Sequence, residues 1–368
     1  MKTISKRIKN DNKNEFQTIF EAKQNNPNLI DLSVGLPEEN TNSSIKQAGI
    51  DAINNNYTRY SSANGLLKLR EAIAKKLQKE NNIAATADTV SVVPGLTTGQ
   101  MALYLTIIDP GDEIIIIEPS YPPYSFLAQM IGAKVTSIKC LYDYQPDINA
   151  LNHAVSENTK AIVINSPNNP TGAVYGEDCL KKIADIASIF DTLIISDEIY
   201  EKYVFEGKHF SIGSIYENTV TMNGFSKSHA MTGWRLGYIN GPLELIKTLN
   251  NVLQYSVFAS STISQYAGIE ALKVEPDLSN YRLKRDFAIS ELHSIGFDVA
   301  GGDGAYYLYI RCPNNFNSGD FFQLALKNNL LIVPGSAFSG ESTHFRISYG
   351  TSMDELRKGL RVLQAIVD

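Results

Sequence analysis

Two side chains suited to chemistry follow directly after short apolar runs. Lys227 comes after TVTM (219–222), and Asp197 comes after TLIIS (192–196). Loss of solvation beside a buried strand lowers the pKa of a lysine, so that its amine can form a Schiff base with an aldehyde and later move a proton. A buried carboxylate is costly unless it is paired, and a protonated ring nitrogen is one such partner. The alternative for Asp197 is a helix N-cap.

Three more side chains fit around an aromatic ring held by this pair. Tyr200 lies three residues after Asp197, and Asn169 lies in SPNNPTG after AIVIN (161–165). Both side chains can hydrogen-bond a hydroxyl oxygen on the ring. Tyr121 in EPSY can stack on the ring face, although plain packing explains Tyr121 equally well when it is taken alone. Together these side chains favour a heterocyclic aldehyde that acts as an electron sink.

The sequence also predicts a phosphate cradle. Gly95, Leu96 and Thr97 precede a helical pattern, and free N–H groups at a helix start bind phosphate. Ser226 and Arg235 can add a hydroxyl and a bidentate guanidinium. The alternatives are a simple N-cap at Gly95 and a surface or interface ion pair at Arg235.

The elements that must position these residues alternate between strands and helices. Continuous apolar runs are typical of strands buried on both faces of a parallel α/β sheet. The expected strands are 91–93, 113–117, 161–165, 192–196 and 219–222, with helices around 97–108, 124–131 and 177–190. Ligands bind beyond the carboxyl ends of such strands, so we expect the five following loops to converge on one edge.

The rest of the chain predicts a smaller α+β unit. A long helical stretch starts near residue 242, and it is followed by AYYLYIRC (305–312), a helix around 319–328, LLIVPG and THFRISYG. The isolated strand-like run LIDLSVG (29–35) is the expected partner of this unit. We therefore predict a large domain over residues 45–265 and a small domain from residues 1–44 and 266–368.

Bulk composition limits the class of protein. The 368 residues are 43 % hydrophobic and 20 % charged, with a formal charge of −6, which argues against a nucleic-acid surface. Three scattered cysteines suit a reducing compartment, and a chain of this length needs no structural metal. The N-terminus lacks a signal-peptide pattern, and the apolar run at 114–117 is too short to span a bilayer. We expect a soluble, cytoplasmic protein with no metal, membrane or nucleic-acid partner.

Several motifs resemble the class I/II, fold-type I aminotransferases, the aspartate-aminotransferase-like group. The matching segments are YSSANGLLKLREAIA (60–74), PGLTTGQ (94–100), IIDPGDEIIIIEPSYPPY (107–124), NSPNNPTG (165–172), SDEIYEKYVF (196–205), SKSHAMTGWRLGY (226–238) and HFRISYG (344–350). The resemblance implies a pyridoxal 5'-phosphate enzyme that moves an amino group between an L-amino acid and a 2-oxo acid. It also implies a large, mostly parallel α/β domain and a small domain built from both chain ends.

The same resemblance implies a role for each matching residue. Lys227 would carry the Schiff base, Asp197 would pair with the pyridine nitrogen, and Tyr121 would stack on the ring. Asn169 and Tyr200 would bond the ring oxygen. The implied phosphate cup is Leu96, Thr97, Ser226 and Arg235. Arg346 would clamp the substrate carboxylate, Gly35 would lie in a loop that closes over it, and Tyr60 would reach the phosphate of a neighbouring subunit in a homodimer.

Departures from the family pattern bear on the substrate. Gly224 stands where a phosphate-binding serine is frequent, and Thr97 stands where some relatives hold an acidic side chain with a lysine. No arginine lies between Arg235 and Arg282, the region from which aspartate-specific relatives lend one to the partner subunit. We therefore expect a neutral or aromatic amino acid. Tyr255, Phe258 and Ser260 either line its pocket or belong to the core.

Other functions stay open at this point. A C–S β-lyase or a cyclising synthase of the same fold would use the same cofactor, because pocket shape selects the bond that breaks. A cofactor-binding effector domain of a transcription regulator is disfavoured, because strand-like sequence begins by residue 29. A nucleotide-dependent oxidoreductase is disfavoured because no GxGxxG follows the first strand.

Overall fold

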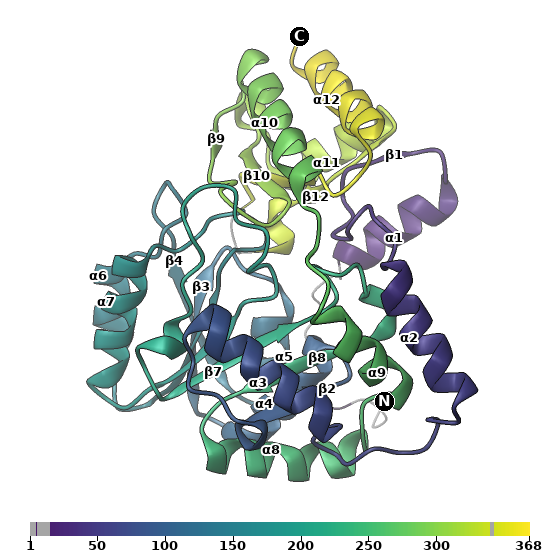
Figure 1. Ribbon diagram of the computed structural model, residues 1–368. Helices are drawn as coiled ribbons and strands as arrows, with labels where there is room; N and C mark the ends of the chain where they lie inside the picture. The colour runs from purple at the N-terminus through teal and green to yellow at the C-terminus, as the bar shows by residue number, and fades with distance from the viewer. Residues whose placement is uncertain (1–4, 6–14, 339–341) are drawn as a thin grey trace.

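The computed structural model describes residue 5, residues 15–338 and residues 342–368 (Figure 1). The basic, Asn-rich start of the chain and residues 339–341 lie outside these ranges. Among the helices of the described ranges, none combines the length and the apolar character needed to cross a membrane.

A seven-stranded sheet forms the centre of the larger part. Its strand order is β2-β8-β7-β6-β5-β3-β4. The strands are β2 (Val90–Val93), β3 (Glu113–Glu118), β4 (Lys134–Lys139), β5 (Thr159–Asn165), β6 (Leu193–Asp197), β7 (Thr219–Gly224) and β8 (Gly237–Asn240). Only β8 runs antiparallel to its neighbours, and because it does so on both sides, β2 points the same way as β7. The carboxyl ends of the other six strands therefore lie at one edge, and the predicted, mostly parallel sheet is confirmed.

Two strands of this sheet were not predicted. β4 lies at the sheet edge and is largely exposed, so its sequence KVTSIK lacks the apolar run that marks the central strands. β8 has only four residues and includes a glycine and an asparagine. β4 lacks a continuous apolar run because that pattern is typical only of strands covered on both faces. β8 is buried, but four residues that include a glycine and an asparagine are too few to give such a run.

Helices cover both faces of the sheet because successive strand residues point to opposite sides. On one face, Ile114 and Ile116 pack in a core formed with α4 (Leu96–Ile107), α5 (Pro123–Ile131) and α8 (Leu243–Ser256). On the other face, Ile115 and Ile117 pack in a core that includes α7 (Glu177–Ser188) and α6 (Ile148–Ala154). A third core, formed with α3 (Leu67–Asn81) and α9 (Thr262–Ala271), covers β2 and β8.

The remaining elements form a smaller unit at the top of the view (Figure 1). A four-stranded sheet has the order β12-β13-β10-β9, from β9 (Val299–Ala300), β10 (Tyr307–Arg311), β12 (Val333–Pro334) and β13 (His344–Ser348). The helices here are α1 (Glu15–Asn25), α10 (Ser279–Ser294), α11 (Ser318–Lys327) and α12 (Met353–Val367). β1 (Ile30–Asp31) pairs in parallel with β11 (Leu330–Leu331). The N-terminal strand thus joins the C-terminal unit, as expected, while the domain boundaries stay a prediction.

The connection between the two parts also differs from the expected single helical stretch. The chain after residue 242 forms two helices, α8 and α9, separated at residues 257–261, where Phe258 has a φ of 69°. A left-handed φ is unfavourable for a bulky side chain and ends the helix there. Earlier in the chain, α2 (Ser43–Asn54) packs against α9.

Candidate active site

Asp197 ends β6 at the edge where the six strands finish, and its carboxylate is buried. Tyr124 donates its hydroxyl proton to Oδ2 at 2.7 Å, and the backbone N–H of Ile199 donates to Oδ1 at 3.1 Å. Burial raises the pKa of the Asp197 carboxyl to about 6, although both hydrogen bonds oppose this rise. No helix starts after Asp197, so the N-cap alternative is wrong.

Lys227 lies in the turn after β7 and faces the same space. Its Nζ donates to the carbonyl oxygen of Gly35 at 2.7 Å and lies 5.8 Å from the centre of the Tyr200 ring. Burial lowers the Lys227 pKa to about 8, with the positive charges of Arg346 and Arg235 acting in the same direction. A pKa of about 8 leaves a useful fraction of neutral amine near neutral pH, as the sequence predicted.

Arg346 comes from β13 in the smaller unit and is buried. It donates from one terminal nitrogen to Oδ1 of Asn169 at 2.9 Å and from the other to the carbonyl oxygen of Ser33 at 2.5 Å. Its guanidinium carbon lies 4.4 Å from the centre of the Tyr307 ring and 4.9 Å from that of Phe338. Its Nε is buried with no hydrogen-bond partner in the described part of the chain. A buried guanidinium with an unused donor fits a carboxylate ligand.

The residues predicted to form a phosphate cradle meet at the start of α4. Gly95 has a φ of +85° and ends the turn before Leu96. A Cβ at Gly95 would collide with the guanidinium of Arg235, which is therefore packed directly on this turn. Arg235 donates to the carbonyl oxygen of Thr232 at 3.1 Å. A guanidinium beside the free N–H groups of a twelve-residue helix makes this end of the site strongly positive.

Thr97, Ser226 and Tyr121 complete the residues predicted around the cofactor. Thr97 lies in the first turn of α4, and half-buried Ser226 directly precedes Lys227. Burial raises the Tyr121 pKa, while a hydrogen bond with Thr97 and the charges of Arg235 and Arg346 lower it. Tyr121 also makes an edge contact with Tyr124, with ring centres 5.6 Å apart. Tyr121 thus lies within electrostatic range of both Arg235 and Arg346.

Position 224, where a serine is frequent in the family, is a glycine here for a steric reason. It pairs with Gly237 across β7 and β8. A Cβ at Gly224 would lie 2.9 Å from the Cα of Gly237 and 3.0 Å from the carbonyl oxygen of Leu236. The two backbones are too close here for any side chain.

Sequence reasoning missed several residues of this site. Tyr124 holds Asp197, and Asn165 holds the Asn169 loop by accepting the N–H of Asn169 at 2.8 Å. Tyr307 hydrogen-bonds Tyr200, with 2.8 Å between the hydroxyl oxygens, and Tyr306 donates to the Gly35 carbonyl at 3.1 Å. The sequence does contain these aromatics, in YPPY and AYYLYIRC, but only the fold brings them to the site.

Behind Asp197 lies a buried ionic network. The carboxylate of Glu198 accepts hydrogen bonds from Ser211 at 2.6 Å and Ser196 at 3.0 Å and lies 2.9 Å from Nε2 of His209. Lys76 forms an ion pair with Glu201. The ligand atoms of Glu198, Glu201 and His209 lie within 4.8 Å of one another, as in a metal site. Because the ammonium of Lys76 already neutralises Glu201, this group is better described as an ion-pair network that fixes the 197–203 loop.

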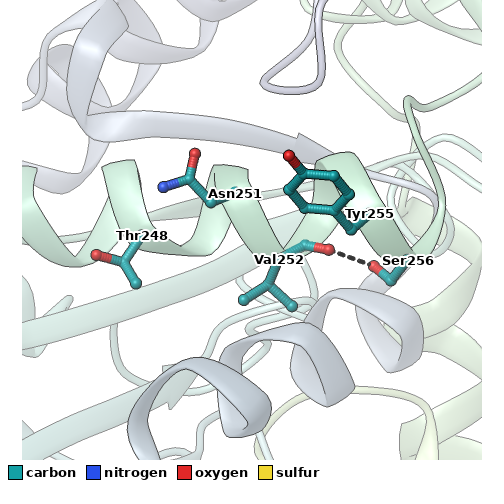
Figure 2. Close-up of a pocket in the computed structure, with 5 residues that line it drawn as sticks. All are labelled: Thr248, Asn251, Val252, Tyr255 and Ser256. Carbon is teal, nitrogen blue, oxygen red and sulfur yellow. Dashed lines mark hydrogen bonds between the residues drawn. The ribbon is translucent and has the colours of Figure 1, made fainter.

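Tyr60 and the suggested pocket residues lie away from this centre within one chain. Tyr60 is 81 % exposed, and its ring packs on Phe258 with centres 4.5 Å apart. Tyr255 is 92 % exposed on α8, in a shallow surface pocket formed by that helix alone (Figure 2). Ser260 is buried and donates to the carbonyl oxygen of Val92 at 3.2 Å. Ser260 therefore belongs to the core, whereas Tyr255 and Phe258 are exposed at the surface.

The charges of the site define what it can hold. Lys227, Arg235 and Arg346 have no carboxylate partner in the described part of the chain, and Asp197 has no cationic one. Asp197 and Arg346 are buried, Lys227 is half-buried and Arg235 is exposed. Buried charges without an ionic partner are costly, so a ligand is expected to pair with them. The arrangement fits a molecule with a phosphate at Arg235, a carbonyl at Lys227 and a basic ring nitrogen at Asp197, beside a second, carboxylate-bearing molecule at Arg346.

Comparison with known proteins gives the class to which this fold and site belong. The family model for aminotransferase class I and II matches residues 27–363, and the chain belongs to this family. It is 35 % identical to the aspartate/prephenate aminotransferase of Thermus thermophilus, over 93 % of this chain and 91 % of that protein. It is 33 % identical to aromatic-amino-acid aminotransferase 2 of Thermococcus litoralis, over 99 % and 98 %.

Solved structures agree with the sequence comparison. The Thermus thermophilus aspartate aminotransferase solved with maleate matches with a TM-score of 0.92 and 32 % identity, with all of both chains covered. The protein is accordingly an aminotransferase of the α/β fold anticipated from the sequence. The alternative of a lyase or cyclising synthase is not favoured by these relatives.

Proposed function

We propose that the protein binds pyridoxal 5'-phosphate on Lys227 and transfers amino groups between a neutral or aromatic L-amino acid and a 2-oxo acid. The observation that carries the proposal is a set of charges without an ionic partner among the described residues: Lys227 and Arg235 between β7 and β8, and Arg346 on β13, against Asp197 at the end of β6. The proposed cofactor-binding residues are Gly95, Leu96, Thr97, Tyr121, Asn169, Asp197, Tyr200, Ser226, Lys227 and Arg235, with Tyr60 from a neighbouring subunit.

Each residue around the proposed cofactor has a different role, which follows from its position. When bound, the cofactor supplies a protonated pyridine ring that draws the electron pair from the substrate Cα. Asp197 keeps the ring nitrogen protonated, because an ionised carboxylate beside it favours the charged form. Lys227 Nζ, with a pKa of about 8, would take up the proton that leaves the substrate Cα, hold it, and return it to the bound substrate–cofactor pair. Tyr121 would exclude water from the ring.

Substrate binding rests on Arg346 and its neighbours. Amino and oxo acids share a carboxylate, and the unused Nε of Arg346 provides a donor for it. Asn169 orients the guanidinium, and the Gly35 loop lies over Lys227 through its carbonyl. Thr97 offers no positive charge to a second carboxylate, which supports a neutral or aromatic side chain. The names of the relatives cover aspartate, prephenate and aromatic amino acids, so a substrate panel must include all three classes.

A homodimer with shared sites is part of the proposal. Exposed Tyr60 and Phe258 form one aromatic contact, and Tyr255 projects from the outer face of α8 (Figure 2). Exposed aromatic side chains are typical of buried interface anchors. Three free cysteines support a cytoplasmic location. The domains would divide as residues 45–265 against 1–44 with 266–368.

Borohydride reduction tests the cofactor assignment. Purified protein reduced with borohydride and digested is expected to yield one pyridoxyl-labelled peptide, centred on Lys227. The Lys227→Ala variant should give no labelled peptide and no turnover, while Lys202→Ala, which removes a partly buried lysine paired with Glu80, should label normally. A label on another lysine, or full turnover of Lys227→Ala, would refute the assignment.

A panel of amino donors tests the substrate class. Phenylalanine, tyrosine, leucine, alanine, aspartate and glutamate are each paired with 2-oxoglutarate, pyruvate and prephenate, and the oxo-acid product is measured. We expect the highest kcat/KM for a neutral or aromatic donor. A preference for aspartate would contradict the side-chain assignment, and release of ammonia with pyruvate would contradict transfer.

A further inference from the structure

Tyr307 connects the two ends of the site. Its hydroxyl oxygen lies 2.8 Å from that of Tyr200, and its ring centre lies 4.4 Å from the guanidinium carbon of Arg346. Tyr307 is fully buried at the start of β10, where Tyr309 pairs with Arg346 of β13. Tyr307 is then the diagonal neighbour of Arg346 on the same sheet face, a spacing that long side chains bridge. One residue therefore contacts both the phenol and the guanidinium.

The hydroxyl of Tyr307 has little freedom to move away. A Cβ at Gly35 would lie only 2.5 Å from it, so this oxygen is packed against the backbone of the Gly35 loop. Tyr306 donates to the Gly35 carbonyl and holds that loop in place. The hydroxyl thus lies between the Gly35 backbone and Tyr200, its hydrogen-bond partner.

The direction of the hydrogen bond follows from the charges. Each phenol has one proton, so one of the two hydroxyls must accept. A guanidinium over the Tyr307 ring stabilises negative charge there and makes Tyr307 the better donor. Burial raises the pKa of both phenols, and the pKa of Tyr200 lies well above its usual value. At Tyr307, the positive charge of Arg346 is the largest effect that opposes the rise. With Tyr307 as the donor, Tyr200 accepts, and the proton of Tyr200 remains available for a ligand.

We infer that Tyr307 is a positioning residue that donates its hydroxyl proton to Tyr200 and supports the Arg346 guanidinium on its ring. The inference rests on the proposed function, in which Tyr200 donates to the ring oxygen of the cofactor. A phenol that accepts a hydrogen bond donates more strongly itself. Tyr200 thereby draws electron density from the ring oxygen and makes the nitrogen at Lys227 less basic.

Tyr307→Phe tests the role of the hydroxyl. The holoenzyme is titrated from pH 5 to 10, and the pH midpoint of the absorbance change of the bound cofactor is recorded. Loss of one neutral hydrogen bond, worth about 1 kcal/mol, should raise this midpoint by roughly 0.7 pH units. KM should stay unchanged, because phenylalanine keeps the ring under Arg346. The matched control is Tyr144→Phe, which removes a phenol that donates to the Tyr309 carbonyl at 3.0 Å and should leave the midpoint unchanged.

A double-mutant cycle shows whether Tyr307 acts through Tyr200. In the Tyr200→Phe background, Tyr307→Phe should cause no further shift of the midpoint. An equal shift in both backgrounds, or none in the wild-type background, would overturn the inference. Absence of the cofactor absorbance band in the wild-type protein would instead overturn the proposed function, so the two failures are distinguishable.

Tyr307→Leu tests the role of the ring. Removing the aromatic face from beneath Arg346 should raise KM for amino and oxo acids together by roughly 2- to 30-fold over Tyr307→Phe, the range of a cation–π contact of about 0.5–2 kcal/mol. Equal KM values for the two variants would overturn this part. Circular dichroism and cofactor loading verify that the leucine variant is folded, and Tyr307→Phe keeps the inference testable if it is not.

Discussion

At the scale of single residues, the site is defined by charges that have no ionic partner among the residues the structure describes. Asp197 is buried and accepts hydrogen bonds from two neutral donors, the hydroxyl of Tyr124 and the N–H of Ile199. An ionic partner would stabilise its charged form by far more than these neutral donors do. The identity of Asp197 at the end of an apolar strand was readable from the sequence, whereas its support by Tyr124 was not, because that contact links residues 73 positions apart.

The pKa of Asp197 leads to a testable pH dependence of cofactor binding. Because the carboxyl has a pKa of about 6 without a cationic partner, the charge that holds the ring nitrogen is lost as the pH falls through 6. We expect the affinity of the apoenzyme for pyridoxal phosphate to fall by roughly tenfold per pH unit below that point. Fluorescence titration between pH 4.5 and 8 measures it.

Asp197→Asn is the control for this pH dependence. The phosphate of the cofactor also titrates near pH 6, and the asparagine variant retains that contribution. The difference between wild type and Asp197→Asn should therefore be largest above pH 6 and disappear below it. The variant should also lose about 3 kcal/mol of transition-state stabilisation, or roughly a hundredfold in kcat/KM. Parallel pH curves for the two proteins would be incompatible with the role given to Asp197.

At the scale of elements, the β7–β8 pair explains a departure from the family pattern. Gly224 and Gly237 face each other, and a side chain at Gly224 has no space. Gly224→Ser should therefore destabilise the fold by about 1–3 kcal/mol through overpacking, instead of adding a phosphate ligand. Thermal unfolding and cofactor affinity measure both effects. Gly176→Ser, at an open position before α7, should be neutral or slightly stabilising. Tighter cofactor binding by Gly224→Ser would contradict this steric explanation.

The ion-pair network behind Asp197 predicts a pH-dependent stability. Burial favours the neutral ring of His209, but the charge of Glu198 and the hydrogen bond between them outweigh it and raise the His209 pKa. The stabilisation is complete below the unfolded pKa of about 6.5 and is lost as the pH rises through the folded value.

We expect the difference in unfolding free energy between wild type and His209→Gln to be largest below pH 6.5 and to shrink at higher pH. Denaturant unfolding from pH 5.5 to 9 at fixed protein concentration measures it. His153→Gln, which changes an exposed histidine on α6, should show no such trend. A difference that grows with pH would assign the opposite charge state to His209.

At the scale of the whole molecule, exposed aromatics predict an assembly. Tyr255 on α8 is almost fully exposed, and a charge there would disrupt an interface built around it. We expect Tyr255→Asp to dissociate the proposed dimer and to lower activity, because Tyr60 would no longer reach the neighbouring site. Sedimentation velocity over a concentration series measures dissociation. Phe20→Asp, at an exposed position on α1, should leave the assembly intact. A monomeric wild type, or a fully dimeric Tyr255→Asp, would refute this arrangement.

The sequence by itself determined five strands of the central sheet, the strand ends that carry Asp197 and Lys227, and the family. These features depend on local patterns: an apolar run predicts a buried strand, and a turn with fixed residues directly follows it. The partners of those residues, Tyr124 at Asp197 and Tyr307 at Tyr200 and Arg346, were decided only by the tertiary structure. So were the steric exclusion at Gly224, the edge strand β4 and the outward position of Tyr255. Each depends on which distant segments pack together, and packing between distant segments leaves no periodic signal in a single chain.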